Sequence, residues 1–102
     1  MRAIERTTRQ FVASLEAAIP GLHVSIERSV TPYGRSNYIH IRDQAQRRYW
    51  KVRISDHPIG MRRALSGRED LYITAGTRPP SWAVWIGEFR RAIETLQTKE
   101  AS

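Results

Sequence analysis

The stretch Asn37–Ile54, NYIHIRDQAQRRYWKVRI, decides the fold. Apolar and polar residues alternate over 37–42 and again over 48–54, with the polar run 43–47 between them. Such alternation is typical of half-buried strands, and a short polar run between two of them predicts a hairpin. Five apolar residues then share the inward face of this hairpin: Ile39, Ile41, Trp50, Val52 and Ile54.

Two further strands are predicted on either side of the hairpin. Residues 22–30 alternate with Leu22, Val24 and Ile26 inward, and a turn-rich connection at 31–36 joins them to the hairpin. A strand at 70–74 follows the long connection 55–69.

Helices are predicted at both ends of the chain. Residues 3–19 carry one apolar stripe at helical spacing, and Pro20 and Gly21 end it. Residues 81–97 carry a broader stripe, with Ser81 as the expected N-cap. We expect four residues of this stripe, Trp85, Ile86, Phe89 and Ile93, to be buried against Ile39, Ile41, Val52 and Ile54.

The predicted order is αββββα in a single domain over 1–102, with the sheet spanning 22–74 and a frayed tail at 98–102. One apolar face for each strand and helix predicts an α+β two-layer sandwich. It contains a four-stranded antiparallel sheet with the N- and C-terminal helices packed on one face. The other sheet face would meet solvent or a partner.

The composition favours an anionic partner. The chain has 102 residues and a net charge of +7, and all of its 17 basic residues except Lys51 and Lys99 are arginine. Arginine pairs bidentately with phosphate, although a GC-rich genome also favours its codons. No cysteine, membrane-length apolar run or secretory signal is seen, so we expect a cytoplasmic protein without disulfides or membrane contact.

The outward strand positions form an unusual set. They are His23, Ser25, Glu27, Tyr38, His40, Arg42, Tyr49, Lys51, Arg53, Tyr72 and Thr74. Tyrosines stack on bases and nearby cations hold phosphates, as on the four-stranded sheet of an RRM, although the element order differs from an RRM and no RNP-type motif is present. Tyrosine is also a common strand residue, and a Tyr/Arg surface also suits a protein interface.

Further arginines border the connections, where they could contact phosphates or an acidic protein patch or simply be solvated: Arg47, Arg48, Arg62, Arg63 and Arg68. The predicted binding residues are therefore Tyr38, His40, Arg42, Arg47, Arg48, Tyr49, Lys51, Arg53, Arg62 and Arg63.

The segment Ser55-Asp56-His57 contains the components of a catalytic triad, but adjacent residues cannot place the histidine between the other two. Turn formation by Asp56 ahead of Pro58 is the simpler interpretation. A metal site of His40, Asp56 and His57 is conceivable, but nothing in the spacing selects it. We therefore expect no enzyme, no cofactor and no metal.

The sequence Ser36-Asn37-Tyr38-Ile39-His40-Ile41, followed by Val52-Arg53-Ile54-Ser55-Asp56-His57, resembles a pattern of short phage and prophage proteins. That pattern has S-x-Y-I on one strand and I-R-I-S-D-H at the end of the next. The resemblance implies a mobile-element origin and a bacterial host, with no defined activity. Such proteins often act by binding, and anti-CRISPR inhibitors are one class, although many of those are acidic and this chain is basic.

The sequence thus predicts a small non-enzymatic phage-type binding protein. Its basic, Tyr/Arg-bearing surface would engage nucleic acid or a nucleoprotein. One such nucleoprotein is a host CRISPR complex, which this protein would inhibit. One alternative is a protein–protein interaction module that contacts an acidic protein surface. Another is a small metal-dependent nuclease using His40 and His57. A homodimer is compatible with each.

Overall fold

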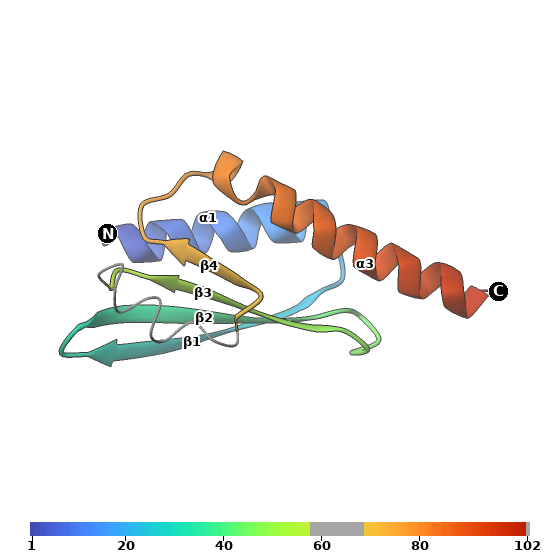
Figure 1. The fold of residues 1–102 in the computed structure, drawn as a ribbon, viewed down its shortest axis with the longest axis horizontal. Coiled ribbons are helices and arrows are strands. Elements are labelled where there is room, and N and C mark those ends of the chain that lie inside the picture. Colours follow the sequence, from blue (N-terminus) through green and yellow to red (C-terminus); the bar gives the residue numbers. More distant parts are fainter. Residues whose placement is uncertain (58–68, 102) are drawn as a thin grey trace.

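The computed structural model describes residues 1–57 and 69–101, and its order of elements confirms the α+β class. The elements are α1 (Ala3–Ala18), β1 (His23–Thr31), β2 (Gly34–Arg42), β3 (Tyr49–Ser55), β4 (Leu71–Thr74), the 3-10 turn η1 (Pro79–Ser81) and α3 (Ala83–Ala101). Figure 1 shows α1 and α3 together on one side of the sheet.

The sheet is mixed, and the prediction of a fully antiparallel sheet is wrong. The strand order is β1-β2-β3-β4, with antiparallel pairing from β1 to β3 and parallel pairing between β3 and β4. A parallel neighbour needs a crossover of about a dozen residues or more, and the chain between Ser55 and Leu71 is long enough for one. The short connections before and after β2 permit only antiparallel hairpins.

The core lies between the helices and the inward face of the hairpin. Ile39, Ile41, Trp50, Val52 and Ile54 are all buried, as the alternation predicts. A second apolar set packs onto them from α1, from the residue that precedes α3 and from α3, at helical spacing: Ile4, Phe11, Leu15, Trp82, Ile86, Phe89 and Ile93. The Trp50 and Phe89 rings lie 5.1 Å apart between centroids, so α3 packs directly on β3.

Three expectations about α3 need correction. Trp85 is 40% exposed, because the buried stripe runs through Trp82, Ile86 and Phe89 and leaves Trp85 at its edge. Ser81 belongs to η1 and does not cap the helix, since its hydroxyl donates to the Arg78 carbonyl at 2.8 Å. The helix also continues to Ala101, through the expected frayed tail.

Strand β1 is the least covered element of the sheet. Leu22 and Val24 pack against the core, but Ile26 is 37% exposed and Val30 is 67% exposed. The expected half-buried strand is therefore covered only near its start. Its main tie to α1 is polar: Arg28 donates to Glu5 from Nε at 3.1 Å and from Nη2 at 3.2 Å.

Glu5 connects α1 to both β1 and β2. Besides Arg28, the buried Asn37 amide donates to the Glu5 carboxylate at 3.1 Å and to the Thr8 hydroxyl at 2.9 Å. The hydrogen bonds from Arg28 and then from Asn37 lower the pKa of Glu5 below its usual value, against a smaller opposing effect of burial. This polar cluster fixes how α1 lies on the sheet.

Candidate nucleic-acid interface on the outer sheet face

We call the side of the sheet away from α1 and α3 the outer face; no helix of the described residues covers it (Figure 1). Strand alternation brings most of the predicted binding residues there. The antiparallel register sets Arg42 opposite Tyr49, His40 opposite Lys51, and Tyr38 opposite Arg53. Neighbouring β1 adds His23 opposite Arg42, Ser25 opposite His40, and Glu27 opposite Tyr38. The sheet pairing thus confirms that these side chains share one face.

The cations of this face lie over its tyrosine rings. The Arg42 guanidinium carbon is 4.7 Å from the Tyr49 ring centroid, and the Lys51 Nζ is 4.8 Å from the Tyr38 ring centroid. Cation–π contacts of this kind hold long side chains in place. Arg42 and Lys51 thus have contacts on this face without a ligand, and the tyrosine rings they cover are less open to stacking by a base.

A hydrogen-bonded relay of three side chains fixes His40. Its Nε2 lies 3.1 Å from the Glu27 Oε1, and its Nδ1 lies 2.6 Å from the Tyr49 hydroxyl. A carboxylate only accepts, so Nε2 carries the proton that it donates to Glu27. In the neutral ring Nδ1 then accepts from the Tyr49 hydroxyl. The His40 and Tyr49 rings are also stacked, at 5.9 Å between centroids.

Beside this relay the outer face is hollowed. The hollow has a volume of about 300 Å³ and is lined by His23, Val24, Ser25, His40 and Arg42. The Ser25 hydroxyl, the Arg42 guanidinium and the His23 imidazole can donate hydrogen bonds around one space, whereas both His40 nitrogens are already bonded to Glu27 and Tyr49. Phosphate oxygens accept such bonds, and arginine matches their geometry bidentately. The chemistry of the hollow therefore fits a phosphate group.

Arg53 does not lie on an open surface, and in this respect the sequence expectation is wrong. It is 1% exposed. Its Nη2 donates to the Ser36 hydroxyl at 3.1 Å and lies 3.0 Å from His57 Nδ1, while its Nη1 lies 3.9 Å from the Glu69 carboxylate. Arginine is always a donor here, so His57 Nδ1 accepts and carries no proton. By strand parity Arg53 lies on the outer side of the sheet, where it is the centre of a buried polar cluster with Ser36, His57 and Glu69.

This cluster explains the pattern S-x-Y on β2 and R-x-S-x-H at the end of β3. The register sets Ser36 opposite Ser55 and Tyr38 opposite Arg53. The Ser36 hydroxyl donates to the Ser55 hydroxyl at 3.1 Å, and the His57 backbone N–H donates to the same Ser55 oxygen at 3.1 Å. The pattern's polar residues are therefore in mutual contact, which gives them a structural role.

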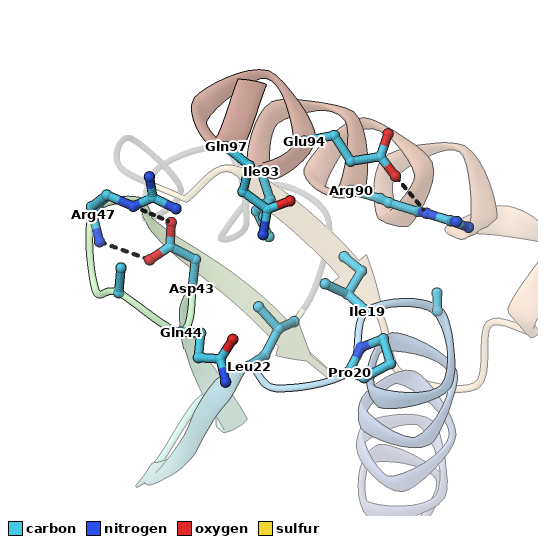
Figure 2. Close-up of a pocket in the computed structure, with 12 residues that line it drawn as sticks. Ile19, Pro20, Leu22, Asp43, Gln44, Arg47, Arg90, Ile93, Glu94 and Gln97 are labelled. Atoms are coloured by element: carbon cyan, nitrogen blue, oxygen red, sulfur yellow. Dashed lines mark hydrogen bonds and ion pairs between the residues drawn. The ribbon is translucent and has the colours of Figure 1, made fainter. Parts of the chain in front are cut away.

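Arg47 and Arg48 lie on the helix side of the hairpin and not on the outer face. Arg47 pairs with the buried Asp43, its Nε lying 3.6 Å from Oδ2 while its backbone N–H donates to Oδ1 at 2.7 Å. Figure 2 shows this pair at the edge of a pocket of about 380 Å³ between the end of α1, the hairpin loop and α3. The Arg48 guanidinium lies 5.2 Å from the Trp50 ring centroid. Arg62, Arg63 and Arg68 lie outside the described residues.

The histidines considered as metal ligands lie in separate networks. His40 contacts Glu27 and Tyr49, and His57 contacts Arg53. The Asp56 carboxylate accepts from the Arg35 backbone N–H at 2.6 Å. Within residues 1–57 and 69–101, no group of three or more His, Asp or Glu side chains is placed to hold a metal ion.

The predicted site list lacked His23, Ser25 and Glu27, which the structure places beside Arg42, His40 and Tyr38. Their outward parity on the first strand was visible in the sequence. What it could not show is that β1 pairs with β2 in a register that puts Ser25 opposite His40. That register closes the hollow.

No protein-family model matches the chain, and comparisons with curated proteins and with solved structures give no significant match. Among the helices of the described part, none has the length and apolar character needed to cross a membrane.

Proposed function

We propose that this protein binds single-stranded nucleic acid on its outer face, mainly through the phosphate backbone. The observation that carries the proposal is the hollow of His23, Ser25, His40 and Arg42, with Lys51 opposite His40 on the neighbouring strand. The net charge of +7 favours approach of a polyanion.

Phosphate contact is favoured over base stacking for a geometric reason. The Tyr49 ring contacts both the Arg42 guanidinium and the stacked His40 ring, and the cations of both Lys51 and Arg53 lie near the Tyr38 ring. These contacts compete with the stacking of a base on the same rings. Backbone recognition needs no such change and carries little sequence information. We therefore expect weak sequence preference and strong salt dependence.

The test is fluorescence anisotropy with a labelled single-stranded oligonucleotide across a series of salt concentrations. Each phosphate contact contributes about 0.7 to the slope of log K against log salt for a single strand. Arg42→Gln should weaken binding several-fold and reduce the slope by about that amount. Arg91→Gln changes the net charge equally, but at an exposed position of α3, and should behave like the parent.

Two outcomes count against the proposal. If Arg42→Gln and Arg91→Gln bind alike, the outer face is not the site. If the unmodified chain binds no oligonucleotide at low salt, nucleic acid is not the partner. The exposed Glu27 carboxylate, which makes this face mixed in charge, would then favour a protein partner.

A further inference from the structure

Strand β1 forms one edge of the sheet. It is nine residues long, and its only strand neighbour in the described part of the chain is β2. An edge of this length offers a row of backbone donors and acceptors to another strand. The question is which of its residues present them, and whether the side chains there fit a definable partner.

The hydrogen bonds of Arg35 determine which β1 residues direct their backbone groups away from β2. Its backbone N–H donates to Asp56 Oδ1, and its carbonyl accepts from the Asp56 N–H, so both of its backbone groups face the β3 side. Arg35 is the Cα partner of Val30. In an antiparallel ladder such residues alternate with those bonded to each other. The backbone groups of Val24, Ile26, Arg28 and Val30 therefore point away from β2, outward from the edge of the sheet.

The same residues carry their side chains toward the helix side of the sheet, where α1 leaves them uncovered. Val24 reaches the core, but Ile26 and Val30 are 37% and 67% exposed. Between them stands Arg28, whose guanidinium is held by two hydrogen bonds to Glu5. The edge thus presents two apolar side chains on either side of a cation that already has its counter-ion.

We propose that two copies of this chain pair through β1, antiparallel, with Arg28 opposite Arg28. A two-fold axis perpendicular to the sheet keeps each face on its own side, so opposed residues must have the same parity. Centring on Arg28 sets Ile26 of one copy opposite Val30 of the other, twice, and covers both exposed apolar residues. Glu27 then lies opposite Ser29 on the outer face.

The neighbouring registers are worse by the same criteria. Centring on Glu27 opposes two carboxylates and puts Ile26 opposite Arg28. Centring on Ile26 puts Val24 opposite Arg28 and carries Val30 beyond the end of the partner strand. Directly opposed like charges destabilise a strand pair, and apolar pairs stabilise it. In the Arg28 register the facing guanidinium groups are each neutralised by their own Glu5.

The chain contains no cysteine, which allows a direct test of the register. Opposed residues that exchange backbone hydrogen bonds have Cα atoms about 5.5 Å apart, within disulfide range. Under mild oxidation Arg28→Cys should form a disulfide-linked dimer in high yield. Glu27→Cys, one residue away, should not, because its counterpart in the partner would be Ser29.

Light scattering on the unmodified chain tests pairing without any substitution. The expected mass rises with concentration toward twice the 11.8 kDa of one chain, and Val30→Lys should shift the transition to higher concentration. A monomer mass at every concentration overturns the proposal. Equal cross-linking of Glu27→Cys and Arg28→Cys overturns the register. Oligonucleotide binding by a strictly monomeric chain would leave the proposed function standing and remove only this inference.

Discussion

Tyr38 and Arg53 face each other across β2 and β3, and the Arg53 guanidinium carbon lies 5.3 Å from the Tyr38 ring centroid. The Tyr72 ring of β4 lies at the same distance, 5.3 Å, from that carbon. One buried cation therefore contacts the aromatic residues of both neighbouring strands. It links the antiparallel and the parallel halves of the sheet at a single point.

Replacing Arg53 should lower the stability of the fold, and this prediction does not involve ligand binding. Arg53→Met removes the cation beside the buried Glu69 carboxylate, and breaking a buried pair in this way costs about 3–5 kcal/mol. Urea denaturation measures the loss. The double variant with Glu69→Gln should recover part of it, since the negative charge that Arg53 faced is then removed as well. Stability equal to the parent in Arg53→Met would show that the cluster contributes nothing.

Phe89 and Trp85, which sequence analysis treats alike, should separate experimentally. Phe89 is 4% exposed and packs against Trp50, so Phe89→Ala should cost about 3–5 kcal/mol. Trp85→Ala removes a side chain that is 40% exposed and should cost about 1–2 kcal/mol. Thermal unfolding followed by circular dichroism gives both values. Equal losses would contradict the placement of α3.

Gly34 should tolerate no side chain. Its φ is +150°, and a Cβ there would lie 2.5 Å from His57 Cδ2 and 2.6 Å from Asp56 Oδ1. Gly34→Ala must therefore shift the end of β3, at a cost of about 1–3 kcal/mol. Gly76 also has a positive φ, +92°, but a Cβ there would meet nothing within 4 Å. Gly76→Ala therefore serves as the control for backbone strain alone. The first variant should be the less stable of the two by chemical denaturation.

Glu5 should make stability depend on pH in the acid range. Its pKa in the folded chain is lowered from 4.5, chiefly by the hydrogen bonds from Arg28 and Asn37. The stabilisation is therefore fully present above about pH 4.5 and is lost as the pH falls through the lower folded value. Glu5→Gln should lower the melting temperature at neutral pH.

The difference between the Glu5→Gln variant and the parent should shrink as the pH is lowered below 4.5. Glu16→Gln, at an exposed position of the same helix, is the matched control and should follow the parent throughout. A constant difference between Glu5→Gln and the parent at all pH values would mean that the carboxylate charge is not what matters.

Tyr49→Phe should show whether oligonucleotide binding depends on the order of the side chains around the hollow or only on their charge. The variant keeps the ring under Arg42 but loses the 2.6 Å contact with His40 Nδ1. Oligonucleotide affinity should fall modestly, by about 1 kcal/mol for one neutral hydrogen bond, while the salt slope stays at the parent value. A reduced slope would instead indicate that the Tyr49 hydroxyl, through its contact with His40, helps to hold Arg42 in its binding position.

The hairpin could be predicted from the sequence because its alternation reports directly on burial. Ile39, Ile41, Trp50, Val52 and Ile54 all proved buried. Alternation carries no information on strand direction, so the parallel placement of β4 could not be foreseen. Alternation also predicts on which face of the sheet a side chain lies, but not which other residues cover that face. The parity of Arg53 was right, but its burial depends on His57, Glu69 and Tyr72, which approach from other parts of the chain.

In the candidate site, too, strand alternation predicts the face of some residues and says nothing about others. Parity places Tyr38, His40, Arg42, Tyr49 and Lys51 on one face, and the register confirms it. Arg47 and Arg48 follow a polar loop, where alternation stops, and nothing in their sequence separates a surface cation from a partner of Asp43 or Trp50.

The placement of the tryptophans has a spectroscopic consequence. Trp50 and Trp82 are buried in the core, Trp85 lies on α3, and no tryptophan belongs to the outer face. Indole emission from this chain is therefore a signal of the core and α3, whereas tyrosine absorbance and emission originate in part beside the hollow. One unlabelled sample thus contains two optical probes, and a ligand on the outer face should perturb the tyrosine signal while leaving the tryptophan maximum in place.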